Sequence, residues 1–290
     1  MHFAPMSTFH NPDWLKKYDF QYTNAEAIPK QIYNSINKKL QAISSDAPEV
    51  SIIIAAWNEE SRLLAAIASL ADNKTSTSIE IIVINNNSVD GTQSIIDRLH
   101  VIGLNQPIQG CGPARQLGLD HAKGKFILTA DADCIYPENW IEGMMRDLRK
   151  PGVVCVYGRY SFIGNKKKSR TQLFLYEKLK DVMANIRHFK RPHMNCVGLS
   201  MGFLARPAKK VGFVMRNIRG EDGRMCFDLM KFGRIIQVKG SRLRVWTGTR
   251  TLDKDGTILK ALKVRTLKEV KRASDYIKLH PHHDTKTSQN

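Results

Sequence analysis

Three nearly continuous apolar runs, each rich in β-branched residues, constrain the fold of this chain more than any other feature. They cover residues 50–56, 79–84 and 126–130. A run that is apolar at nearly every position, rather than at alternate positions, is typical of a strand buried on both faces of a parallel sheet. Segments with helical spacing of apolar residues lie between the runs. We therefore predict an α/β fold, a mostly parallel sheet with helices on both faces.

Apolar residues at spacings of three and four predict the helices. Between the strands, these helices cover residues 59–70, 90–99 and 114–122, with Asp90 placed to cap the second of them. Beyond the third strand we predict one more strand and two more helices, at 153–157, 171–188 and 224–232. In the helix over 171–188 we expect the apolar residues to lie mostly on one side.

The chain divides into three predicted regions. Residues 1–48 form an N-terminal extension with a helix over 30–43, residues 49–250 form the main domain, and residues 251–290 form a basic helical tail. The N-terminus lacks the basic start and apolar run of a signal peptide. The longest apolar stretch, residues 50–57, is far shorter than the ~20 residues that cross a bilayer. These features predict a cytoplasmic protein that can associate with the inner face of the membrane.

Net charge is the outlying feature of the composition. The chain has 45 Lys and Arg against 27 Asp and Glu, a formal charge of +18. Such a balance predicts a polyanionic partner: nucleic acid, an anionic membrane or a phosphorylated substrate. No helix-turn-helix, zinc finger or RNP-type motif accompanies the charge, which makes nucleic acid the least favoured partner. The five cysteines form no CxxC pair, so their spacing predicts neither a zinc site nor a disulfide framework.

Polar residues follow each predicted strand at the edge where parallel sheets place their ligand sites. Asp131 and Asp133 come directly after the third strand and can hold a divalent cation such as Mg²⁺ or Mn²⁺, although a solvated turn is the simpler alternative. Trp57, followed by Asn58 and Glu59, comes after the first strand. Its ring can stack on a nucleobase or pack beneath a loop.

Three further groups carry the same ambiguity. Asn86 and Ser88 can hydrogen-bond a base or ribose, or serve only as turn residues. Arg115, on a helix after a Gly-rich turn, can face phosphate. Glu221 and Asp222 open a helix, where acidic residues are favoured by the helix dipole, but either can also act as a general base.

Together, in order and spacing, these segments resemble the family 2 glycosyltransferases, which have the GT-A fold. The resemblance runs from about residue 50 to 240 and is carried by VSIIIAAWNEE, IIVINNNSVDGT, GPARQLGLDHAKGKFILTADAD and RGEDGRM. It implies an inverting, metal-dependent enzyme that moves a sugar from a nucleotide-diphosphate donor to a hydroxyl acceptor. The family varies in its acceptors; membrane binding by the basic tail would favour a lipid-linked acceptor, and a surface glycan precursor is the other candidate.

The resemblance also implies residue roles. Asp222 matches the catalytic base, and Asp131 and Asp133 match the metal ligands, with Asp131 also near the donor. The implied donor and nucleotide residues are Ala55, Trp57, Asn58, Glu59, Asn86, Ser88 and Arg115, the last facing the diphosphate. The implied acceptor region holds Gly198, Ser200 and Glu221.

Departures from the family pattern bear on the donor. Ala55 replaces the usual Pro, and Asn85 and Asn86 replace two Asp residues. An amide carbonyl can accept a hydrogen bond from uracil N3–H, whereas guanine with two adjacent donors is better met by a carboxylate. This favours a UDP-sugar. The absence of a Q-x-x-R-W segment disfavours a processive polysaccharide synthase.

Two alternatives to an active transferase remain open from the sequence: a protein that binds a nucleotide sugar without transferring it, and, less favoured, a basic nucleic-acid-binding protein. The tail is open as well. Its apolar stripe through Leu259, Leu262 and Leu267 is surrounded by Lys and Arg. Such a helix can lie on an anionic membrane or pack its stripe on the domain.

Overall fold

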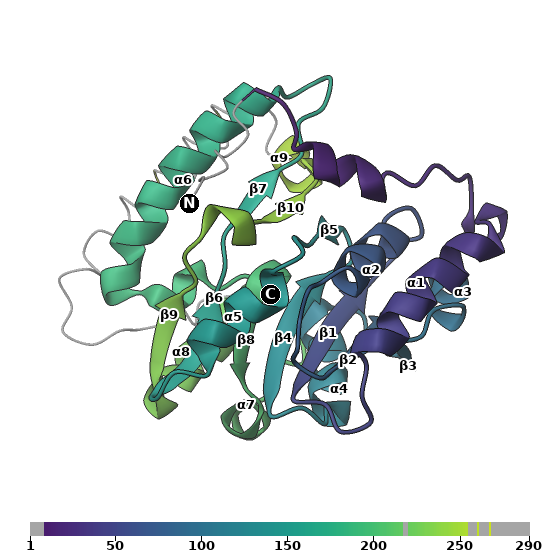
Figure 1. The fold of residues 1–290 in the computed structure, drawn as a ribbon. Coiled ribbons are helices and arrows are strands. Elements are labelled where there is room, and N and C mark those ends of the chain that lie inside the picture. Colours follow the sequence, from purple (N-terminus) through teal and green to yellow (C-terminus); the bar gives the residue numbers. More distant parts are fainter. Residues whose placement is uncertain (1–8, 217–219, 255–259, 261–266, 268–290) are drawn as a thin grey trace.

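A seven-stranded sheet forms the centre of the molecule (Figure 1). The computed structural model describes residues 9–216, 220–254, 260 and 267. The strand order is β3-β2-β1-β4-β8-β6-β9, and β8 runs antiparallel to both of its neighbours while the other pairs are parallel. The strands are β1 (Val50–Ala56), β2 (Ile79–Asn85), β3 (Ile102–Asn105), β4 (Phe126–Asp131), β6 (Val153–Tyr157), β8 (Met201–Leu204) and β9 (Arg234–Gln237). The predicted mostly parallel α/β sheet is confirmed.

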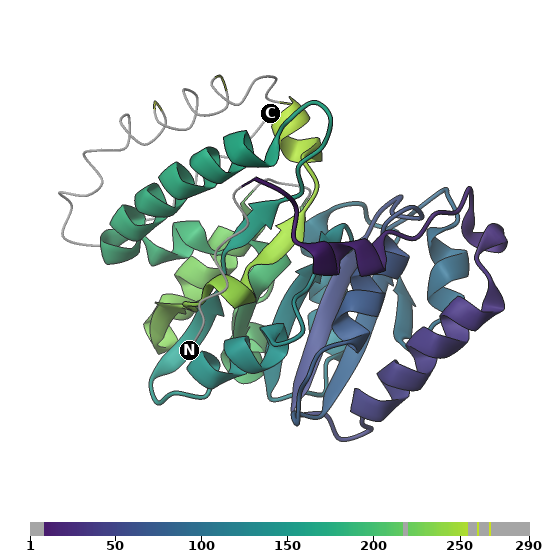
Figure 2. The same ribbon diagram turned by 45° about the horizontal axis from the view of Figure 1, so that its top comes forward.

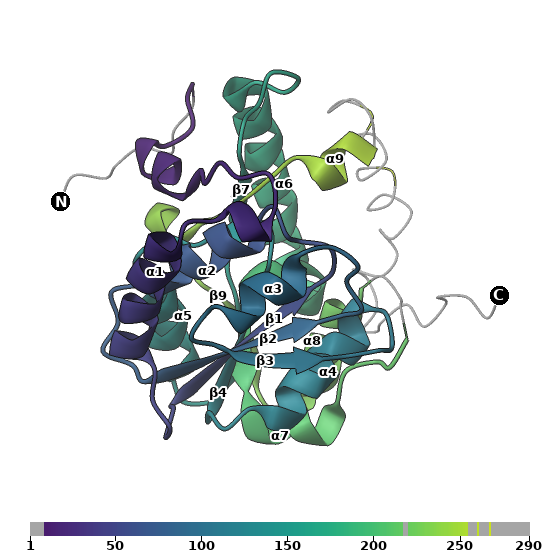
Figure 3. The ribbon, with the colours of Figure 1, turned by 90° about the vertical axis from the view of Figure 1, so that its right-hand side faces the viewer.

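Helices cover both faces of this sheet (Figure 3). On one face α2 (Leu63–Ala71) and α5 (Trp140–Leu148) pack on the strands, and α1 (Lys30–Ile43) packs against α2. On the other face lie α4 (Cys111–His121), α7 (Ala205–Val211) and α8 (Glu221–Leu229). Helix α3 (Thr92–Asp97) follows β2. Each face has its own hydrophobic core, which explains why β1 is apolar at nearly every position.

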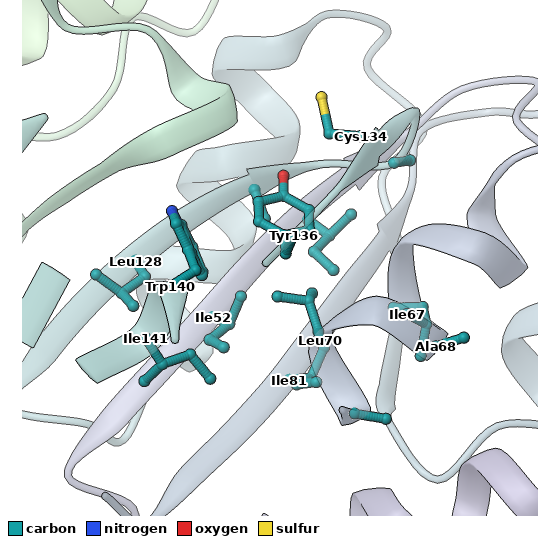
Figure 4. Close-up of a cluster of buried hydrophobic side chains, with 14 of the residues drawn as sticks. Ile52, Ile67, Ala68, Leu70, Ile81, Leu128, Cys134, Tyr136, Trp140 and Ile141 are labelled. Carbon is teal, nitrogen blue, oxygen red and sulfur yellow. The ribbon is translucent and has the colours of Figure 1, made fainter. Parts of the chain in front are cut away.

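The core on the α2 and α5 side reaches from the sheet to the site edge (Figure 4). Ile52 and Leu128 of the sheet lie under Trp140 and Ile141 of α5, and all four are buried. Tyr136 stacks beside Trp140, with ring centroids 4.7 Å apart. Its hydroxyl lies toward the carboxyl end of β4, so the core positions a polar group at that edge.

A small three-stranded sheet lies beyond the carboxyl ends of β1 and β4 (Figures 1 and 2). It consists of β5 (Cys134–Ile135), β10 (Val245–Thr247) and β7 (Tyr160–Phe162), and it is covered by α6 (Arg170–Lys190) and α9 (Arg250–Lys254). Phe162, Leu173, Tyr176 and Leu252 form its core. The space between the two sheets is where the polar strand ends converge.

Several predicted boundaries need correction. Helix α2 begins at Leu63 rather than at residue 59, because Glu59 O accepts hydrogen bonds from the amides of Arg62 and Leu63 in a turn. Helix α3 is shorter than predicted: Gly91 takes the N-cap position, and the Asp90 carboxylate accepts from the Thr92 amide. Helix α8 begins earlier, at Glu221, and is followed by a 3-10 turn.

Helix α6 contradicts one expectation. Its apolar residues do not share one side: Leu173 and Tyr176 are buried, whereas Leu175, Leu179 and Val182 are exposed. The predicted basic tail lies almost wholly outside the described residues. None of the helices in the described part of the chain combines the length and apolar character needed to span a bilayer.

The N-terminal region is part of the folded body from residue 9 onward. It forms two 3-10 helices, η1 (Asp13–Tyr18) and η2 (Ala25–Ala27), before α1. Tyr18 is buried and donates a hydrogen bond to Asp72, 2.9 Å away. The predicted helix over residues 30–43 is confirmed as α1, whose Ile36 and Leu40 join the core.

Candidate active site

A cavity of about 730 Å³ opens between the two sheets at the carboxyl ends of β1 and β4. Segments far apart in the sequence line it: the ends of β1 and β4, the turn after η3 (Pro192–Asn195), the start of α8, and the β10–α9 connection. Of the predicted site residues, those that line it are Ala55, Trp57, Glu59, Asn86, Arg115, Asp131, Asp133, Glu221 and Asp222. The structure therefore brings together most of the set selected from sequence.

Arg115 of α4 is the centre of this cavity's floor. Its guanidinium is 3% exposed, and Nη1 donates to Glu221 Oε1 at 3.0 Å and to the Asp222 carboxylate. Nη2 donates to Asp131 Oδ1 at 3.0 Å. Three carboxylates engage both terminal nitrogens in this arrangement, and contact between Arg115 and a donor diphosphate stays a prediction. Arg115 holds carboxylates from β4 and α8 in one place.

The two carboxylates of α8 are positioned by backbone as well. Gly220 takes the N-cap position with φ of 98°, a left-handed conformation that favours glycine. Asp222 Oδ2 accepts from the Gly198 amide at 2.7 Å. A Cβ on Gly198 would overlap the Arg115 guanidinium, so this position requires glycine. Gly198 is therefore a supporting residue of the site, although it does not line the cavity.

Asp131 is the last residue of β4, and Asp133 lies on the turn that follows. The Tyr136 hydroxyl accepts from the Asp131 amide at 2.7 Å and contacts Leu199 O at 3.2 Å, which fixes the turn against the core. Burial raises the pKa of Asp131 to about 7 against the opposing effect of Arg115, and the neighbouring Asp133 and Asp222 add to the rise. A proton or a cation is therefore needed to relieve this negative charge.

The charges of the residues that line the cavity indicate whether a divalent cation fits there. Among its described lining residues, five carboxylates face two arginines, Arg115 and Arg250. Oxygens of Asp131 and Asp133, with the Cys134 thiol, lie within 4.8 Å of one another. Carboxylate oxygens are the ligands that Mg²⁺ and Mn²⁺ prefer. The two aspartates thus fit a hard divalent cation.

Trp57 and Arg250 form the opposite rim. Trp57 is 53% exposed and lines the cavity, so its ring is available for stacking. Arg250 donates to Glu59 Oε1 at 2.6 Å and to Asp133 Oδ2 at 2.9 Å. It is half-exposed and bridges the turn after β1 to the turn after β4. Sequence reasoning did not select Arg250, because nothing local marks an arginine on a short helix as part of a site.

Asn58, which follows β1, and Asn86 and Ser88, which follow β2, mainly contact other residues of the protein. Asn58, at φ of 53°, accepts from the Val89 amide at 2.9 Å, and its own amide donates to Ser88 Oγ at 3.0 Å. Neither Asn58 nor Ser88 is among the lining residues. Asn86 lines the cavity, but its side chain donates to Gln106 O and Ile108 O and accepts from the Gly110 amide. Contact between Asn86 and a base stays a prediction.

Ser200 needs a correction. It was predicted in the acceptor region, yet it is 1% exposed and absent from the cavity lining. Its hydroxyl accepts from the Trp140 indole at 2.9 Å, which satisfies the one polar atom of that buried ring. Ser200 therefore supports the core beneath the site rather than the acceptor.

Three thiols lie beneath the cavity, although cysteine spacing predicted no such group. Cys155, Cys196 and Cys226 have sulfur atoms within 4.8 Å of one another, and Cys196 also lines the cavity. The Cys226 thiol contacts Met201 Sδ at 3.1 Å. They come from β6, the end of η3 and α8, and no sequence spacing links these segments.

Comparison with known proteins agrees with this geometry. The model of the family "Glycosyl transferase family 2" matches residues 51–211, more than half of the chain. An Escherichia coli relative, named UDP-Glc:alpha-D-GlcNAc-diphosphoundecaprenol beta-1,3-glucosyltransferase WfgD, is 30% identical over 121 residues, which are 40% of this chain and 47% of the relative. In this relative and in three other curated relatives, the matched segment spans less than half of the relative's length.

Solved structures show the same fold at low sequence identity. Residues 1–349 of TarS of S. aureus, in complex with UDP-GlcNAc, have a TM-score of 0.53 at 15% identity over 69% of this chain and 58% of that TarS fragment. The mannosyltransferase PcManGT of Pyrobaculum calidifontis, in complex with GDP-Man and Mn²⁺, has a TM-score of 0.54 at 15% identity over 75% and 68% of the two chains. These likenesses support the GT-A fold. The family match shows that this chain belongs to glycosyl transferase family 2.

Proposed function

We propose that this enzyme transfers a sugar, with inversion, from a UDP-sugar to a hydroxyl of a lipid-diphosphate-linked sugar, and that the transfer requires a divalent cation. One observation carries the proposal. The Asp131–Asp133 pair and Asp222 lie in one cavity and are connected through Arg115, with Asp131 and Asp222 on the same guanidinium. A donor site and a candidate base are therefore adjacent.

On the donor side, we propose that Trp57 stacks on the base and that the two aspartates hold Mg²⁺ or Mn²⁺; the exposed ring of Trp57 and the proximity of the two carboxylates in the cavity support this. The bound cation would supply positive charge for the donor diphosphate in a cavity that is otherwise acidic. Arg250, half-exposed at the rim, can leave Glu59 and Asp133 and turn to phosphate when a donor enters.

On the acceptor side, Asp222 is the proposed general base. It takes the proton of the acceptor hydroxyl as that oxygen forms a bond to the anomeric carbon. The bond between the anomeric carbon and the diphosphate oxygen breaks, and the electron pair leaves with the diphosphate. Attack from the face opposite the leaving group inverts the configuration. Arg115 and the Gly198 amide fix the orientation of the Asp222 carboxylate for this step.

The donor and acceptor classes rest on two supports. The E. coli relative described above, and a second one named WfaP that is 32% identical over 115 residues, both carry names for glucosyl transfer from UDP-Glc to a sugar on diphosphoundecaprenol. Apolar side chains, including Met194, Val197 and Leu199, line the wall of the cavity near α8. Such a wall suits a sugar that arrives on a lipid carrier.

A donor screen tests the proposal. The full chain is incubated with UDP- and GDP-sugars, Mn²⁺ and a short-chain lipid-diphosphate sugar, and product is measured by mass spectrometry. We expect product with one or more UDP-sugars and at least a hundredfold less product with EDTA. Transfer that persists in EDTA would overturn the metal requirement, and preference for a GDP-sugar would overturn the donor assignment.

A further inference from the structure

Helix α6 carries an exposed apolar stripe that the described residues of the chain leave uncovered. Five residues, spaced four, three, four and three apart, form it: Leu175 (64% exposed), Leu179 (41%), Val182 (53%), Ile186 (56%) and Phe189 (87%). At about 100° per residue they fall within a band about 80° wide along one side of the helix. We call these five residues the α6 stripe. Contiguous exposed apolar surface of this kind marks an interaction site.

The opposite face of α6 fixes the helix in this orientation. Glu177 is fully buried, pairs with Arg170 at 2.7 Å, and accepts from the Phe162 amide at 2.7 Å. Leu173 and Tyr176 pack into the small core with Leu252 of α9. Turning the helix to bury the stripe would break this buried ion pair and empty the small core, which costs far more than the stripe gains. The exposure is therefore built into the fold.

Charge around the stripe favours an anionic partner. Lys178 and Lys190 are exposed beside it, and Lys166 and Lys167 are exposed in the loop that leads into α6. The two acidic residues of α6 are committed elsewhere, Glu177 to Arg170 and Asp181 to Arg159 and Arg244. An apolar stripe flanked by lysines complements the interface of a bilayer that contains anionic lipids.

The position of α6 links such a surface to the cavity. Tyr160 and Phe162, just before the helix, and Met194 and Val197, just after it, line the cavity. Figures 1 and 2 show α6 along the outer side of the small sheet, beyond β7 and β10. If α6 binds to a surface, the cavity therefore lies at a fixed distance from that surface.

We propose that the α6 stripe and its flanking lysines dock this enzyme on an anionic lipid bilayer, with α6 lying in the interface. Docking through α6 would hold the cavity near the headgroups, where a lipid-diphosphate-linked acceptor presents its sugar. The role in acceptor delivery rests on the function proposed above, whereas docking itself does not. The surface is formed by described residues and does not depend on the basic tail.

Vesicle co-sedimentation of the full chain tests the docking. Vesicles of phosphatidylcholine alone are compared with equal parts phosphatidylcholine and phosphatidylglycerol, without donor or acceptor. The triple variant Leu175→Gln/Val182→Gln/Ile186→Gln should bind anionic vesicles at least about tenfold more weakly than the unchanged chain. Phe232→Gln, which changes an exposed aromatic residue on another element, is the matched control and should bind normally. Circular dichroism and thermal unfolding show whether each variant is folded.

Two more test variants, each with a control, separate contact of the stripe with lipid from attraction by the flanking lysines. Phe189→Trp places an indole in the stripe that brominated lipids should quench, and Phe232→Trp should stay unquenched. Lys178→Glu/Lys190→Glu should weaken binding to anionic vesicles several-fold, and Lys231→Glu, on the same element as Phe232, should not.

The outcomes are distinct. Normal vesicle binding by the folded triple variant would place docking elsewhere, such as the basic tail, and would overturn the proposal. So would absence of binding by the unchanged chain, or a dimer that the triple variant dissociates, which would make the stripe a protein interface. If the triple variant loses vesicle binding but keeps transfer to a short-chain acceptor, docking stands independently of catalysis. Absence of transfer with intact vesicle binding would contradict only the proposed function.

Discussion

The two halves of the main sheet are built by different means. In the parallel half, the inner strands β1, β2 and β4 gain their position from burial: every residue of β2 is buried, and β1 pairs with β2 and β4 along its length. In the second half, with β8, β6, β9 and the small sheet, the strands are mostly shorter, and buried or partly buried ion pairs connect the elements. Arg244, for example, donates to Asp181, Ser161 and Tyr160.

This difference matches a division of labour at the site. The carboxylates proposed to bind the donor, Asp131 and Asp133, lie at the end of a strand of the parallel half, whereas Glu221, Asp222 and the apolar wall come from the second half. Burial of apolar residues is enough to position the end of a strand. A general base must be held in one orientation, and ion pairs with fixed geometry can provide this orientation. The following experiments test this division.

The largest expected effect separates catalysis from donor binding. Asp222→Asn should lower kcat by at least about a thousandfold, because the amide cannot take the acceptor proton, while the donor Kd changes by less than about threefold. Transfer assays and calorimetric titration with UDP-sugar and Mn²⁺ give the two values. Asp228→Asn, an identical change on the outer side of the same helix, should leave both near normal. A large loss of donor affinity in Asp222→Asn would remove the division of labour.

Removing Arg115 should show how strongly the halves depend on each other. Arg115→Met leaves three carboxylates close together without a cation and should lower the free energy of unfolding by about 3 kcal/mol. Urea denaturation measures this. Arg224→Met removes the exposed pair with Asp228 on the same helix as Asp222 and should cost less than about 1 kcal/mol. Equal losses in the two variants would mean that Arg115 does not connect the halves.

Acidification should weaken metal binding at the donor half. Because the pKa of Asp131 is raised to about 7, this carboxyl is increasingly protonated below pH 7, and a proton competes with the cation. The affinity for Mn²⁺ should fall by up to about tenfold per pH unit between pH 7 and 6, whereas a carboxyl with an ordinary pKa would give almost no change there. Titration followed by Mn²⁺ electron paramagnetic resonance measures it. A flat profile over this range would contradict the raised pKa.

The smallest effect concerns the core beneath the donor half. Tyr136→Phe deletes the hydroxyl that accepts from the Asp131 amide and should destabilise the protein by about 1 kcal/mol and raise the donor KM more than it lowers kcat. Tyr33→Phe is a control of the same type on α1, away from the cavity, and should leave KM unchanged. A change confined to kcat would assign Tyr136 to the acceptor half instead.

The same contrast explains what could be predicted from the sequence. Strands β1, β2, β4 and β6 were predicted within one residue of their ends because full burial leaves a continuous apolar signal. Strands β7 and β10 have three residues each, too few for any period to emerge. Helix α5 was missed although Trp140, Ile141, Met144, Met145 and Leu148 have helical spacing, so the signal was present there.

At the site, residue types were predictable but their partners were not. Asp131 and Asp222 follow recognisable motifs, and the cavity contains both. The position of Arg115 among three carboxylates depends on chain segments that meet only in the folded protein, as does the bridge from Arg250 to Glu59 and Asp133. Ser200 is an example of a residue whose motif suggested a role at the acceptor. In the structure its hydroxyl instead accepts a hydrogen bond from the Trp140 indole, a partner that the sequence does not reveal.

The long sequence separation across Arg115 has a consequence for synthesis of the chain. Its partner Asp131 follows 16 residues later, whereas Asp222 follows 107 residues later. During synthesis, the segment that carries Asp131 is therefore complete well before the segment that carries Asp222. The Gly198 amide, which donates to Asp222, likewise gains its partner only after α8 has been synthesised. On the roles proposed above, a nascent or truncated chain without α8 has the two metal ligands but lacks the base that transfer requires.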